Sequence, residues 1–103
     1  ELLDELKQVA KADLDLDVVT EALVELGMTK EGIDYLSAIS GNDLAKRMNL
    51  AKLLVLEKRF DEAKQRLLIE DALLDPRTGK FISAHQRVED IRAGKDDGSN
   101  WKY

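Results

Sequence analysis

Apolar residues recur every three or four positions along residues 1–40, which is the spacing of one face of an α-helix. The pattern predicts three short helices in this part of the chain. Asp15 or Asp17 can cap the second helix, and Thr29 can cap the third. Gly27 is expected to end the second, because glycine enters the left-handed conformation without strain. The inward positions are Leu2, Leu6 and Val9, then Val19, Leu23 and Leu26, then Ile33, Leu36 and Ile39.

A longer apolar pattern follows the break at residues 40–42 and predicts a central fourth helix. A tight turn at Phe60 leads into a fifth helix, which is expected to run to Asp75 because Pro76 forces the preceding residue out of helical geometry. The sequence Ser83–Gln86 has the form of a capping box for a last helix, which Gly94 ends. The inward positions are Leu44, Met48, Ala51 and Val55, then Ala63, Leu67 and Leu74, then Ala84, Val88 and Ile91.

These elements predict an all-α fold, a compact bundle of five or six short helices. Residues 1–94 are expected to form one helical domain, which suits a chain of 103 residues, and residues 95–103 a flexible, polar C-terminal tail. An alternative makes Leu73–Leu74 and Phe81–Ile82 the arms of a small hairpin around the turn cluster Asp75–Lys80. An isolated hairpin is marginally stable in water, which favours the helical interpretation.

Charge is distributed unevenly along the chain. The net charge is −5, but residues 1–43 carry 11 acidic and three basic side chains, or −8, and residues 44–103 carry 10 acidic and 13 basic side chains, or +3. Opposite charges of this kind attract, within one chain or between copies. We therefore expect self-association or partner binding that weakens as salt screens the charges.

Residues that could support chemistry are few. The chain has no cysteine, and its one histidine, His85, could form with Glu89 only half of a metal site. Asp13, Asp15 and Asp17 have the spacing that opens a calcium loop, but the glycine and glutamate which that loop requires are replaced by valine. Gly79-Lys80 lacks the earlier glycine and the following hydroxyl of a phosphate-binding loop. No enzyme, cofactor or metal is expected.

Apolar runs in the sequence fall short of the roughly 20 residues that span a bilayer. Together with the absence of cysteine, this suggests a cytoplasmic protein without a membrane partner.

The segment Asn49–Pro76 resembles a single tetratricopeptide-repeat helix pair. Leu50, Ala51 and Leu54 match its first helix, Phe60-Asp61-Glu62-Ala63 matches its turn and small crossing residue, and Leu67 matches its second helix. The chain departs from the family pattern at Glu70, where a small residue belongs, and at Pro76, which comes one residue late. The resemblance implies an antiparallel helix pair, a unit that builds peptide-binding grooves in that family.

The segment Asp43–Glu57 also resembles the start of a helix-turn-helix. Ala45 matches the small residue at the helix crossing, and Asn49 matches the turn. This resemblance implies a recognition helix over Ala51–Glu57, with phosphate contacts from neighbouring cations. The two resemblances disagree about Asn49, which lies in a turn in one and in a helix in the other.

The leading functional expectation is a non-enzymatic helical protein–protein interaction module, an adaptor or assembly subunit that binds another protein or copies of itself. Trp101 and Tyr103 are candidate partner-binding residues, because aromatic anchors carry a large share of interface energy. Removal of the tail after Gly94 should then leave the fold intact. The alternative is a helix-turn-helix-like nucleic-acid-binding regulator or packaging factor, which would use a basic stripe of Lys46, Arg47, Lys52, Lys58, Arg59, Lys64 and Arg66.

Overall fold

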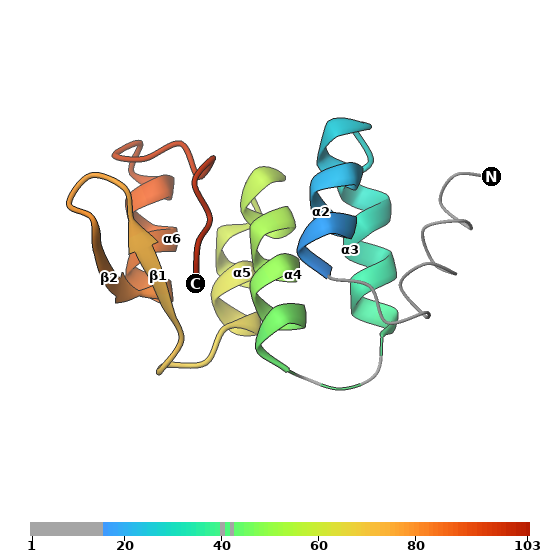
Figure 1. Ribbon diagram of the computed structural model, residues 1–103, viewed down its shortest axis with the longest axis horizontal. Coiled ribbons are helices and arrows are strands. Elements are labelled where there is room, and N and C mark those ends of the chain that lie inside the picture. The colour runs from blue at the N-terminus through green and yellow to red at the C-terminus, as the bar shows by residue number, and fades with distance from the viewer. Residues whose placement is uncertain (1–15, 40, 42) are drawn as a thin grey trace.

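The fold is mostly helical and ends in a small antiparallel sheet followed by one more helix (Figure 1). The computed structural model describes residues 16–39, 41 and 43–103, so the predicted helix with Leu2, Leu6 and Val9 lies outside the described residues. The helices are α2 (Leu16–Glu25), α3 (Thr29–Ala38), α4 (Leu44–Leu56), α5 (Phe60–Arg66) and α6 (Ala84–Arg92), and the strands are β1 (Ala72–Asp75) and β2 (Lys80–Ser83).

Helix α4 lies at the centre of the molecule, with α2 and α3 on one side and α5 on the other (Figure 1). Asp43 caps it, because the carboxylate accepts a hydrogen bond of 3.0 Å from the Lys46 N–H. The helix runs unbroken through Asn49, which is only 3% exposed, so no turn lies at that position. The apolar side chains that α4 buries are Met48, Leu50, Ala51, Leu53, Leu54 and Val55.

The predictions for α2 and α3 are confirmed in outline and corrected at two residues. Gly27 ends α2 with a φ of 69°, and the Met28 N–H donates back to the Leu23 carbonyl. Leu26, however, is 50% exposed. Thr29 does not cap α3 but is its first residue, and its hydroxyl donates to Glu57 at the end of α4.

The prediction that α5 continues to Asp75 is wrong. The helix ends at Arg66, and the chain turns into the hairpin that the sequence suggested only as an alternative. The physical reason is a long-range ion pair. Arg47 on α4 donates to both carboxylate oxygens of Asp71, at 3.0 and 2.9 Å, and Asp71 also accepts the Leu68 N–H. These bonds hold the backbone in a turn where local periodicity favoured a helix.

The hairpin is stable because it is not isolated. Leu73 pairs with Ile82 and Asp75 with Lys80 across the antiparallel strands, and Leu73 is fully buried. Helix α6 packs on both strands and on α5. Since α6 covers the hairpin, the usual weakness of a lone two-stranded sheet does not apply.

Helix α6 begins at Ala84 as predicted, but not through a capping box. The Ser83 side chain makes no capping hydrogen bond, and the Gln86 amide donates to Asp90 one turn later. The helix ends at Arg92, and the predicted Gly94 follows two residues later with a φ of 79°, where the Lys95 N–H donates to the Asp90 carbonyl. Ala84 and Val88 are buried and Ile91 is half-buried, as the apolar pattern predicted.

Candidate interaction site

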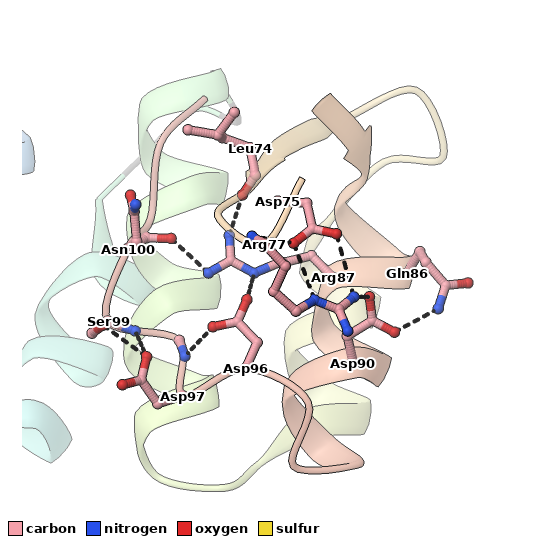
Figure 2. A network of polar contacts seen from close by, with 11 residues as sticks. Leu74, Asp75, Arg77, Gln86, Arg87, Asp90, Asp96, Asp97, Ser99 and Asn100 are labelled. Atoms are coloured by element: carbon pink, nitrogen blue, oxygen red, sulfur yellow. Dashed lines mark hydrogen bonds and ion pairs between the residues drawn. The ribbon is translucent and has the colours of Figure 1, made fainter. Parts of the chain in front are cut away.

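A buried arginine on α6 organises the C-terminal end of the molecule (Figure 2). The Arg87 side chain is fully buried, and its Nε donates to the carboxylate of Asp96. One terminal nitrogen donates to the Leu74 carbonyl at 2.5 Å, and the other donates to the Asn100 carbonyl at 2.6 Å. A buried guanidinium is tolerated because it is paired and hydrogen-bonded in this way.

Two of these three acceptors belong to the segment Asp96–Tyr103, which we call the strap. The strap passes back between the hairpin and α4 rather than extending into solvent (Figure 1). Gly98 is buried against Ile91 and Val55, and a Cβ atom added there would lie 3.3 Å from the Ile91 side chain. Together with its φ of 76°, this close approach favours glycine at position 98.

Short local turns shape the beginning of the strap. Asp96 accepts the Gly98 N–H at 2.9 Å, and Asp97 accepts both the N–H and the hydroxyl of Ser99, at 2.9 and 2.7 Å. The bonds from Ser99 hold the pKa of Asp97 below its usual range. The polar sequence Asp96–Asn100 thus forms turns, which position Asn100 and Trp101.

The two aromatic residues predicted to bind a partner contact the chain's own helices. The Trp101 indole N–H donates to the Met48 carbonyl at 2.9 Å, and the ring lies 5.9 Å from the Arg87 guanidinium carbon. The Tyr103 hydroxyl donates to Asp17 at 2.6 Å. Between them, the Lys102 carbonyl accepts the Leu74 N–H at 2.8 Å. In this conformation the expected flexible tail is bound across α2, α4, α6 and β1.

A second polar network fixes the hairpin to α6 (Figure 2). Arg77, in the hairpin turn, donates to Asp75 at 3.2 Å and to Asp90 on α6 at 2.9 Å. The hydrogen bonds from Arg77 hold the pKa of Asp75 below its usual range. Because both carboxylates are buried, the network keeps the hairpin in one orientation on the helix.

Most of the seven cations proposed as a basic stripe are already in contact with acidic or carbonyl groups. Lys46 donates to the Ile39 and Gly41 carbonyls, and Arg47 to Asp71. Arg59 pairs with Glu62, and Lys64 with Glu89. Within the described part of the chain, no ion pair involves the remaining three cations, which are Lys52, Lys58 and Arg66.

The hairpin also presents an apolar side chain that sequence reasoning missed. Phe81, on β2, is 60% exposed beside the half-buried Leu74, its partner on β1. No pattern in the sequence indicated this exposure, because the hairpin itself was the disfavoured alternative. Arg87 was also missed, although a signal existed. It occupies an inward position of α6, three residues after Ala84 and four before Ile91.

A shallow hollow lies at the start of α5, between Lys58 and Arg92. Its charges largely neutralise one another, since Arg59 pairs with Glu62 and Arg92 with Asp61. Among residues 16–39, 41 and 43–103, no three acidic or histidine side chains are placed to bind a metal ion. In the same residues, no helix has the length and apolar character needed to cross a membrane.

Comparison with protein families, with curated proteins and with solved structures finds no match to this chain. The function is therefore inferred from the geometry of the hairpin and the strap.

Proposed function

We propose that the protein is a non-enzymatic protein–protein interaction module, and that its hairpin accepts an extended segment of a partner protein along β2. The observation that carries this proposal is the exposed Phe81 on the outer edge of β2, along which no strand of the described residues pairs.

The hydrogen bonds around β1 decide which backbone groups of β2 point outward. The Ala84 N–H donates to the Asp71 carbonyl and the Leu74 N–H donates to the Lys102 carbonyl, each at 2.8 Å. Residues of an antiparallel pair alternate between facing their partner and facing away. Since Leu74 faces the strap, its partner Phe81 faces away from β1 on the opposite edge.

The outer edge of β2 therefore offers the N–H and carbonyl of Phe81 and the N–H of Ser83. Lys80, Phe81 and Ser83 are all exposed. An exposed edge with free backbone groups is a template for a further strand, and adding a strand there is a recurrent mode of peptide recognition. The short length of β2 limits unselective pairing, so a binding segment needs a side-chain contact as well as backbone bonds.

The side chains define the partner. Phe81 would pack against an apolar side chain on the added strand. Lys80 is exposed and has no ion pair within the described part of the chain, so it favours an acidic residue nearby. The expected partner segment is extended, with an apolar residue opposite Phe81 and an acidic residue close to Lys80. No observation favours the nucleic-acid alternative, because four of its seven candidate cations are already engaged.

Two substitutions test the proposal without altering the hairpin's internal bonds. Phe81→Ser removes the apolar contact. Ser83→Pro removes an outward N–H at a residue whose φ of −54° already suits proline. The partner is a protein captured by the wild-type chain and then purified. We expect each substitution to weaken its binding by about tenfold or more, as for loss of an interface anchor. The measurement is titration calorimetry with the purified partner.

The matched control is Leu26→Ser, which removes a 50% exposed apolar side chain directly after α2, a helix that lies away from the hairpin (Figure 1). It should bind as the wild type does. An unchanged dissociation constant for both hairpin variants, with circular dichroism showing an intact fold, would contradict the proposal.

A further inference from the structure

The strap is bound by groups that all belong to the remainder of the molecule. Asp96 and Asn100 accept from Arg87, Trp101 donates to the Met48 carbonyl, and Lys102 accepts from Leu74. None of these contacts depends on the strap following α6 in the same chain. An identical strap from a second copy could make every one of them.

The surface that the strap covers, which we call its groove, would be unstable if the strap left it. Arg87 is fully buried and would lose two of its three acceptors, one of them its only carboxylate partner in the part of the chain that is described. Val55 and Ile91 would lose the contact with Gly98. An unpaired buried charge is strongly unfavourable, so a copy whose strap has left its groove requires a replacement with the same chemistry.

A short hinge connects the strap to α6. Ala93, Gly94 and Lys95 are exposed, and Gly94 has a φ of 79° with no atom near the position of a Cβ. When the strap lies in its own groove, which we call the closed form, Gly94 reverses the chain and the Lys95 N–H donates to the Asp90 carbonyl. Opening the hinge at Gly94 breaks that bond and lets the chain continue away from its own groove.

We propose that the strap exchanges between two copies of this chain, so that each strap binds Arg87 of the other copy in a two-fold symmetric dimer. Because only Ala93, Gly94 and Lys95 separate α6 from the strap, the ends of the two α6 helices must lie side by side. This association goes beyond the proposed function, since it involves neither β2 nor Phe81, and a chain with an inactive β2 edge would still exchange its strap.

Single cysteines introduced into this cysteine-free chain test the exchange directly. Leu74→Cys and Lys102→Cys are made in separate full-length chains, mixed at high concentration, warmed to partial unfolding and cooled under mild oxidation. The double variant in one chain is the positive control, because the hydrogen bond between the Leu74 and Lys102 backbones brings these two residues close together. The expected product of the mixture is a cross-linked species of twice the chain mass.

A mixture of Phe81→Cys and Lys102→Cys is the matched negative control, since Phe81 lies on β2, which β1 separates from the strap. If the double variant forms its disulfide within one chain but the mixture yields no cross-linked species, the proposal is overturned. Equal cross-linking in the negative control would overturn it too, because it would indicate random collision.

Substitutions in the hinge provide an independent test, in which sedimentation measures the fraction of dimer. Gly94→Ala strains the closed turn at positive φ, whereas the open hinge can be extended, so the variant should raise the dimer fraction several-fold. Gly27→Ala imposes the same strain at the end of α2, where φ is 69°, and should leave the dimer fraction unchanged. An equal dimer fraction in the two variants would also overturn the exchange.

Discussion

At the scale of single residues, Arg87 shows how a charged side chain can occupy a buried helix position. It lies on the same face of α6 as Ala84 and Val88, where an apolar residue would be expected. Its guanidinium has donors in several directions, and the fold supplies acceptors from β1 and from the strap. The residue therefore ties β1 to the strap, in addition to the direct hydrogen bond from the Leu74 N–H to the Lys102 carbonyl.

Replacing this residue should be costly. Arg87→Leu leaves the buried Asp96 carboxylate and two carbonyl groups without their donor, so we expect a loss of about 3–5 kcal/mol of unfolding free energy. Arg87→Lys keeps the charge but not the three donor directions, and should fall between that variant and the wild type. Guanidinium denaturation measures both.

The control for this experiment is Arg92→Leu on the same helix. Arg92 is 51% exposed in an ion pair of 3.3 Å with Asp61, and such surface pairs contribute about 0–1 kcal/mol. Equal destabilisation by the Arg87→Leu and Arg92→Leu variants would show that the buried network contributes no more to stability than a surface ion pair.

At the scale of the elements, the turn after α5 decides where helix ends and sheet begins. Leu67 leaves the helix with an extended backbone, and His85 on α6 donates to the Lys64 and Leu67 carbonyls at 3.0 Å. Asp71 then joins two helices, because it pairs with Arg47 on α4 and its carbonyl accepts the Ala84 N–H of α6. These bonds satisfy backbone groups that a longer helix would have paired internally.

This turn predicts a specific dependence of stability on pH. The hydrogen bond from Arg47 is the main cause that holds the pKa of Asp71 below its usual range. The folded pKa is thus below the unfolded value of about 3.9, so the stabilisation is complete above about pH 5 and is lost as the pH falls through the folded pKa.

Asp71→Asn should therefore destabilise the protein by about 1.5–3 kcal/mol at neutral pH and by less near pH 3. Urea unfolding at both pH values measures the difference. Asp34→Asn, at an exposed position of α3, serves as control and should change stability by at most about 0.5 kcal/mol. If Asp71→Asn destabilises the protein equally at both pH values, the ion pair with Arg47 is not the source of the pH dependence.

At the scale of the whole molecule, α4 and the strap connect the two ends. Asp17 of α2 accepts hydrogen bonds from Asn49 of α4 and from Tyr103 of the strap, at 2.7 and 2.6 Å. Ion pairs between described residues, in contrast, join residues from Arg47 to Asp96 only. The acidic and basic halves are therefore held together there by apolar packing and hydrogen bonds, and salt-dependent association through their charges stays a prediction.

These contacts argue against the expectation that removal of the segment after Gly94 leaves the helical fold intact. A chain ending at Lys95 leaves Arg87 without two acceptors and uncovers Val55 and Ile91. Amide hydrogen exchange should show faster exchange in α6 and β1, with α2 and α3 less affected. Unchanged protection of α6 would show that the strap is not part of the folded structure.

The sequence by itself determined the helical elements whose information is local. The periodicity around Val19, Ile33 and Met48 predicted α2, α3 and α4, and the glycines at positions 27 and 94 marked two helix ends. It also predicted that Asn49 could belong to a helix, although a turn remained open. Each of these features depends on residues within about one or two helical turns of one another.

Only the tertiary structure decided the hairpin, the path of the strap and the exposure of Phe81. The apolar residues from Leu67 to Leu74 suit a helix or a strand, and the choice depends on Arg47, which reaches Asp71 from 24 residues away. The strap is held by Arg87 and by the Met48 carbonyl, which Trp101 reaches across 53 positions. A periodic pattern reports which side of an element is apolar, but it does not report which distant group satisfies a buried charge or a backbone N–H.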